Sequence, residues 1–309
     1  MLSAAIGGFG IAGGLVGGGV GATAAPMQTA LLAEKTNSAN RTTVFSLFTI
    51  ISNLSGATGA LLANIHSYHL LFTLAIVISL FSVASILPLK EDFRRKPKTT
   101  SKSQKTPASK RNRNIIAKFG ATGAINGSAQ GLIIPFIPII LGSKFLMSNG
   151  AIGDLFAIGG LLTAGFMSLT PYLTRKLGFV RMIMGTRAVS TSLMLAFPFA
   201  SGAVLASVLY VGFTAFRAIS LPSQQSLMMS LVNEDSRASA TGVNQTARLL
   251  PSAASTTGSG VLQDYMSVVI PFEIAFVFNF VNIFLYYRFF WNEEAGGIII
   301  AGKQNVAQK

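Results

Sequence analysis

Long apolar stretches constrain this sequence more than any other feature. A helix that crosses the hydrocarbon core of a membrane needs about 20 mainly apolar residues, and about nine stretches reach that length. They are residues 8–33, 43–64, 68–89, 115–142, 149–173, 179–200, 203–231, 238–262 and 267–291. Lipid cannot hydrogen-bond to an open backbone, so such segments form helices. The sequence therefore predicts an all-α, polytopic membrane protein with about nine transmembrane helices.

The composition agrees with lipid as the solvent. Hydrophobic residues make up 50% of the 309 residues and charged residues only 11%, whereas a soluble domain carries roughly 25% charged residues. The net charge of +14 does not indicate a nucleic-acid surface, because eleven of the 24 Lys and Arg lie between Lys90 and Lys118. The chain has no cysteine, and His66 and His69 lack companions that could bind a metal. We expect no nucleic acid, metal or cofactor.

The connections between the stretches alternate between basic and almost uncharged. The basic connections are 34–42, 90–114, 174–178, 232–237 and the tail after Trp291. The others are 65–67, 143–148, 201–202 and 263–266, and Lys144 is their only basic residue. Basic connections stay in the cytoplasm. We therefore predict a multi-pass protein of the cell membrane with a cytoplasmic central loop, a cytoplasmic C-terminus and an N-terminus outside.

Two distant segments share one pattern. Five residues of the first segment recur 196 residues later (26 to 222), and the pairs are Pro26 and Pro222, Gln28 and Gln224, Leu31 and Leu227, Asn37 and Asn233, and Arg41 and Arg237. Each copy covers the end of one helix, a cytoplasmic turn and the start of the next helix. Both copies run through the membrane in the same direction, as parallel repeats do.

This layout resembles the major facilitator superfamily, whose members have two six-helix halves joined by a long cytoplasmic loop. The segment 53–62, with Gly56 and Gly59, is similar to the glycine-rich part of the family's fifth helix. The segment 174–181 is similar to the family's loop between helices eight and nine. The resemblance implies a secondary transporter rather than an enzyme.

The resemblance also implies a division of the chain. Residues 1–89 correspond to helices four to six of a first half, 90–114 to the basic linker, 115–291 to a complete second half and 292–309 to a cytoplasmic tail. The family's first three helices have no counterpart, so we expect an N-terminally truncated first half. A misassigned start, a split gene and a degraded gene are the three explanations.

Charged residues inside apolar stretches are the candidate functional residues. Each costs about 2.5–3.5 kcal/mol to insert and usually faces a cavity. We predict that Arg217 and Arg248 line a substrate path, with Asp154 as their counter-charge. Polar side chains that would extend this path are Asn126, Gln130, Gln224, Asn244 and Gln245. The alternative is a structural pair that touches no substrate. Arg187 is expected to reach toward the lipid head groups.

The predicted activity is movement of a small solute by alternating access, driven by an ion gradient. The chain has no Walker-type loop, so ATP is not the direct energy source. Asp154 is the candidate for proton coupling, and the family favours efflux of drug-like or metabolite compounds. The alternative is a transport-incompetent remnant, or a subunit that needs a separate N-terminal chain. Gly8, Gly10 and Gly13 match a dinucleotide motif, but the i, i+4 spacing of Gly13 and Gly17 favours helix packing.

Overall fold

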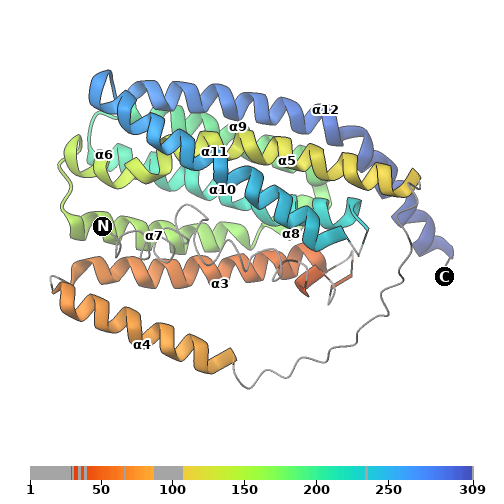
Figure 1. Cartoon of the computed structure of the whole chain (residues 1–309), viewed down its shortest axis with the longest axis horizontal. Coiled ribbons are helices and arrows are strands. Elements are labelled where there is room, and N and C mark those ends of the chain that lie inside the picture. The colour runs from red at the N-terminus through yellow and green to blue at the C-terminus, as the bar shows by residue number, and fades with distance from the viewer. Residues whose placement is uncertain are drawn as a thin grey trace.

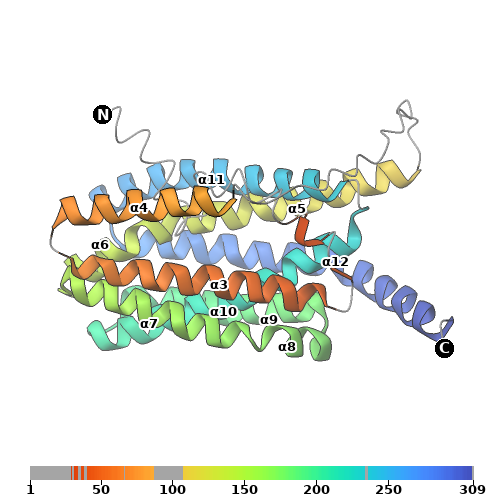
Figure 2. The same cartoon turned by 90° about the horizontal axis from the view of Figure 1, so that it is seen from below.

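The chain is described here from a computed structural model that covers residues 29, 31–33, 36–37, 40–65, 67–86, 107–233 and 236–307. All regular structure in these residues is helical, which confirms the predicted fold class. The helices run nearly side by side along the long axis of the molecule (Figures 1 and 2). The predicted stretch 8–33, with Gly13 and Gly17, lies almost entirely outside the described residues, as does most of the linker.

The other eight predicted stretches all fall on helices. The elements are α3 (Arg41–Leu61), η1 (Leu62–Asn64), α4 (Tyr68–Ile86), α5 (Pro107–Ile133), η2 (Ile134–Phe136), α6 (Ile137–Ser143), α7 (Asn149–Met167), α8 (Thr170–Leu177), α9 (Phe179–Ala196), η3 (Phe197–Phe199), α10 (Ala203–Leu231), α11 (Arg237–Tyr265) and α12 (Val269–Ala307). Six of the described segments are long and apolar enough to cross a membrane. Helix α11 is not among the six, since it is rich in Ser, Thr, Asn and Gln. The total of nine spans stays a prediction.

Prolines divide two of the predicted stretches. The stretch 115–142 becomes α5, η2 and α6, because Pro135 and Pro138 have no N–H to donate to the helical ladder. The stretch 149–173 becomes α7 and α8, and Pro171 lies in the first turn of α8. Helix α5 also begins at Pro107, inside the segment predicted as linker. Its basic first turns extend the helix beyond the apolar part of the span.

Both copies of the repeated pattern begin a helix at the same residue of the pattern, although the hydrogen bonds of their turns differ. Helix α3 begins at Arg41 and helix α11 begins at Arg237. In the first copy, Asn37 and Asn40 exchange reciprocal bonds from backbone N–H to side-chain oxygen, each of 3.0 Å. In the second, the backbone N–H of Asn233 donates to Asn112 Oδ1 on α5 (3.2 Å). The two helices start at the same end of the bundle and run the same way (Figure 1), as parallel repeats require.

Small residues bring α5 and α11 into very close contact. A Cβ atom on Gly127 would lie 2.0 Å from the carbonyl oxygen of Arg248, and one on Gly131 would lie 2.1 Å from that of Ser252. Asn244 Nδ2 donates to the carbonyl oxygen of Phe119 on α5 (2.7 Å). In lipid, the burial of apolar side chains contributes little to helix association. Helices are therefore held together by close packing of small residues and by interhelical hydrogen bonds. This explains how the polar helix α11 is accommodated.

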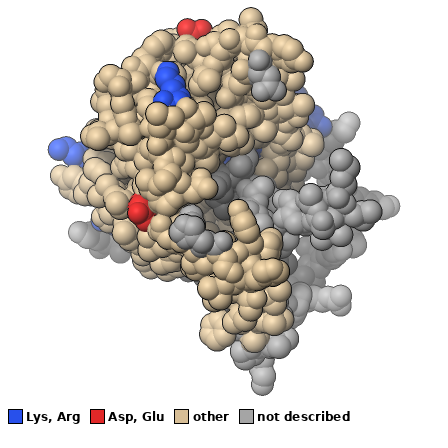
Figure 3. All heavy atoms as spheres, turned by 90° about the vertical axis from the view of Figure 1, so that its left-hand side faces the viewer, with Lys and Arg blue, Asp and Glu red and all other residues tan. Residues whose placement is uncertain are grey.

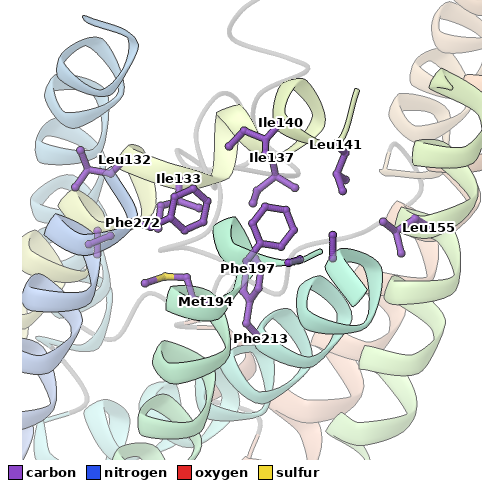
Figure 4. Close-up of a cluster of buried hydrophobic side chains, with 14 of the residues drawn as sticks. Leu132, Ile133, Ile137, Ile140, Leu141, Leu155, Met194, Phe197, Phe213 and Phe272 are labelled. Carbon is purple, nitrogen blue, oxygen red and sulfur yellow. The ribbon is translucent and has the colours of Figure 1, made fainter. Parts of the chain in front are cut away.

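Two buried apolar clusters lie toward opposite ends of the bundle. The first contains Phe197, whose ring stacks on Phe272 at 5.7 Å between centroids and meets Phe213 edge-on at 6.2 Å (Figure 4). The second contains Phe119 and Phe290, whose rings stack at 4.4 Å. Helix α3 joins this body by packing on α7 and α10. Helix α4 is exposed along most of its length, as a lipid-facing helix would be.

The two ends of the bundle differ in charge. Figure 3 shows the end that carries the α3–α4 and α6–α7 connections, where most of the surface is uncharged and charged groups are isolated. At the opposite end, Glu293 forms ion pairs with Arg111 (3.2 Å) and Lys118 (3.4 Å). The guanidinium of Arg181 lies 5.0 Å from the ring of Trp291. Arg111, Lys118 and Arg181 therefore lie at the end opposite the weakly charged connections, in line with the predicted charge pattern.

Labelling of introduced thiols tests which end faces the cytoplasm. The chain has no cysteine, so Ser201→Cys and Lys176→Cys each create a single thiol, and both positions are exposed at connections. A membrane-impermeant maleimide added to intact cells should label Ser201→Cys but not Lys176→Cys, because basic connections remain inside. Permeabilised cells should label both. The reverse pattern in intact cells would invert the topology.

Candidate functional site

A small polar cavity lies between the two apolar clusters. Helices α5, α9, α10 and α12 supply most of its polar side chains, which are Asn126, Gln130, Arg187, Ser190, Thr191, Arg217, Ser220 and Asn279. Its apolar lining includes Met194 and Phe213 of the first cluster. The cavity volume is about 20 Å³, and a water molecule needs roughly 10–15 Å³. The cavity can hold water but must widen to admit a solute.

The sequence order along the four helices explains why the polar residues meet at one depth. Helix α9 carries Ile183 of the second cluster, then Arg187, then Met194 of the first cluster. Helix α10 runs the opposite way, and its order is reversed, from Phe213 through Arg217 to Leu227. Helices α5 and α12 show the same arrangement of apolar, polar and apolar segments. Packing the apolar segments together therefore aligns the polar ones.

Each of the three guanidinium nitrogens of Arg187 has a hydrogen-bond partner. Its Nη1 donates to Asn282 Oδ1, its Nη2 to Gln224 Oε1 and its Nε to Ser220 Oγ (3.5 Å). Its guanidinium also lies 4.7 Å from the centre of the Tyr286 ring. The side chain is only 7% exposed. The prediction that Arg187 reaches the lipid head groups is therefore wrong, because its partners on α10 and α12 hold it inside the bundle.

Asn282 links this network to α5. While its Oδ1 accepts from Arg187, its Nδ2 donates to the carbonyl oxygen of Thr122 (2.7 Å). The chain thus ties α5, α9, α10 and α12 together through one buried guanidinium. Neither Asn282 nor Asn279 is among the site residues predicted from the sequence. The available signal was an amide side chain in the middle of the otherwise apolar helix α12, where polar groups are expensive and functional.

Arg217 is placed differently from Arg187. It is the middle residue of α10, it is half-buried, and it lines the cavity with Asn126 and Gln130. Its guanidinium donates no hydrogen bond to any described residue. The charges of Arg187 and Arg248 both act on it. The structure thus brings three of the predicted path residues to one cavity and leaves the arginine among them without a protein acceptor in the described chain.

The remaining predicted path residues lie elsewhere. Asn244 is buried against α5 through its bond to Phe119, so it holds helices together and does not line the cavity. Arg248 and Gln245 are half-buried on α11, outside the cavity lining. Gln224 does not line the cavity either, and it meets the site through Arg187. Sequence position gave the depth of these residues but not the direction in which each points.

Asp154 does not neutralise the arginines. It is exposed and accepts a hydrogen bond from Asn64 Nδ2 (2.8 Å). It follows the start of α7 by five residues, whereas Arg217 follows the start of α10 by fourteen. At 1.5 Å per residue they differ in depth by roughly 13 Å. The prediction that Asp154 neutralises the arginines is therefore corrected. The described residues also contain no group of three or more His, Cys, Asp or Glu that could bind a metal.

Apolar helices around a buried polar cavity define a multi-pass membrane protein whose interior, rather than its surface, carries the polar chemistry. The sequence model of the Major Facilitator Superfamily matches residues 1–256. Because this match covers most of the chain, the protein belongs to that family of membrane transporters, and the predicted family is confirmed. A search of curated protein sequences finds no match.

Proposed function

We propose that this protein is a secondary active transporter that moves a small solute through the cavity by alternating access, driven by an ion gradient. The observation that supports this most is the polar cavity between two apolar clusters. Charged side chains within a membrane are retained where they serve a path or a coupling site. The two clusters would act as barriers, and opening one at a time would expose the cavity to one side at a time.

The cavity lining bears on the coupling ion, and family membership bears on the direction of transport. None of the described carboxylates lines the cavity, and Asp154 bonds Asn64 instead. The cavity therefore gives no support to Asp154 as the proton carrier. Family membership alone supports efflux of drug-like or metabolite compounds. We also propose that residues 90–114 form a cytoplasmic linker between the two halves of the family fold and that residues 292–309 form a cytoplasmic tail.

Single-thiol labelling tests alternating access without knowledge of the substrate. Thr191→Cys places a thiol in the cavity lining, and the chain has no other cysteine. In proteoliposomes, an impermeant thiol reagent should label it when added on either side, because the site opens to each side in turn. Ser259→Cys is the matched control, since Ser259 is fully buried against α5 and should stay unlabelled from both sides. Labelling of Thr191→Cys from one side only would indicate a blind pocket.

A further inference from the structure

We propose that the solute carries an oxyanion, a carboxylate, phosphate or sulfate group, and that Arg217 contacts this group in the cavity. The inference rests on the proposed transport function and names its substrate class. Three features of the site support this inference. They are a surplus of positive charge, a surplus of hydrogen-bond donors, and the different hydrogen bonding of the two cavity arginines.

The positive charges in the middle of the bundle have no described counter-charge. Arg187 and Arg217 line the cavity, and Arg248 is half-buried on α11, outside the cavity lining. Of the acidic side chains that the structure describes, Asp154 bonds Asn64, Glu293 pairs with Arg111 and Lys118, and Glu273 is exposed near the start of α12. The other acidic residues lie in connections, at the end of α11 or beyond Trp291, and they are Glu34, Glu91, Asp92, Glu234, Asp235, Asp264 and Glu294.

Within the described cavity lining, the polar groups without a partner are donors. Unpaired buried acceptors such as Gln225 Oε1 and Ser226 Oγ lie outside this lining. Gln130 is 7% exposed and lines the cavity, and its Nε2 has no partner among the described residues. The Arg217 guanidinium has no described acceptor either, and on α11 the buried Nε of Arg248 is also without one. Buried donors are normally paired with an acceptor. An oxyanion supplies several acceptor oxygens and a negative charge at once, which a cation or a neutral apolar solute does not.

The two cavity arginines differ in the hydrogen bonds that they form. Each guanidinium nitrogen of Arg187 already donates to Asn282, Gln224 or Ser220, so this side chain is fixed in place and contributes mainly its charge. Arg217 keeps its planar fork available, and a guanidinium fork matches a carboxylate or phosphate with two parallel hydrogen bonds. An anion at this point would also offset the expense of holding unpaired charge inside a membrane. Arg217 is therefore the residue that would touch the solute.

The test measures protection of the cavity thiol in the full chain. In Thr191→Cys proteoliposomes, sodium phosphate, sodium sulfate and sodium benzoate are each titrated at constant ionic strength against sodium chloride. At least one oxyanion should slow labelling in a saturable way. Adding Arg217→Gln should weaken its apparent affinity about tenfold or more, because hydrogen bonds to charged groups are among the strong ones. Arg217→Lys, which keeps the charge but not the fork, should give an intermediate loss.

The control variant is Arg288→Gln, which removes an exposed positive charge from α12 and should leave protection unchanged. This control matters because sulfate and phosphate also stabilise proteins by general exclusion from their surface. Protection that survives Arg217→Gln, or the absence of protection by all three oxyanions, would overturn the proposal. Neither result affects the two-sided labelling of Thr191→Cys, so transport by alternating access stands or fails separately.

Discussion

Replacing Gly127 with alanine is expected to destabilise the protein strongly, although alanine is normally the better helix residue. The added Cβ would meet the carbonyl oxygen of Arg248 at 2.0 Å. That oxygen belongs to a helix backbone, so it cannot move aside as a flexible side chain could. Overpacking of this kind costs about 1–3 kcal/mol, which exceeds the gain of roughly 1 kcal/mol from replacing a helical glycine. The measurement is the thermal midpoint of the detergent-solubilised protein, followed by size-exclusion chromatography.

Glycines with open surroundings provide the matched controls. A Cβ on Gly185 of α9 or on Gly258 of α11 would meet nothing within 4 Å. Gly185→Ala and Gly258→Ala should therefore leave the thermal midpoint unchanged or raise it slightly. Gly131→Ala should behave like Gly127→Ala, because the carbonyl oxygen of Ser252 lies 2.1 Å from its added Cβ. Equal midpoints for Gly127→Ala and Gly258→Ala would show that the α5–α11 contact is looser than described here.

Removing the Arg187 side chain and removing that of Arg217 are expected to change stability in different directions. Arg187→Leu leaves the oxygens of Asn282 and Gln224 without their donor. An unsatisfied buried acceptor costs about 1–3 kcal/mol, so this variant should lower the thermal midpoint and the yield. Arg217→Leu removes a half-buried charge that has no described acceptor. It should leave the midpoint unchanged or raise it, because inserting that charge is itself unfavourable.

Lysine substitutions separate charge from geometry. Arg187→Lys keeps the positive charge, but a single ammonium group cannot reproduce the fork that contacts Asn282, Gln224 and Ser220 at once. It should therefore resemble Arg187→Leu more than the wild type. If Arg217→Leu lowered the midpoint as much as Arg187→Leu does, both arginines would be structural. That outcome would revive the alternative in which intramembrane charges only lock helices together.

The helices themselves were predictable because each has to satisfy its own backbone in lipid. Apolar length located the eight stretches that the structure describes, and the stretch 203–231 coincides with the bounds of α10. Where the helix bounds differ from the predicted stretches, the cause is local. Pro135, Pro138 and Pro171 interrupt the helical ladder, so the predicted stretches 115–142 and 149–173 each contain more than one element. Helix α5 starts earlier than expected, since its polar first turns need no lipid contact.

The candidate site was predictable in part. Arg217, Asn126 and Gln130 were chosen by depth and polarity, and the structure gathers them at one cavity. Arg187 was misplaced because its depth allowed two directions, outward to the lipid heads or inward to α10 and α12. Asp154 was assigned to the arginines as the nearest carboxylate in the sequence pattern, yet it bonds Asn64 near the end of the bundle. No pattern in one helix reveals which neighbour it will face.

The sequence by itself determined that this chain is a helical membrane protein, that its basic connections gather at one end, that a segment repeats and to which family it belongs. These properties depend on the length, charge and order of residues along the chain. Only the tertiary structure decided that Arg187 is hydrogen-bonded to neighbouring helices while Arg217 has no described acceptor, and that Gly127 lies where α5 meets α11. The physical reason is that residue order sets the depth of a side chain along a helix, whereas rotation and helix packing set its partners.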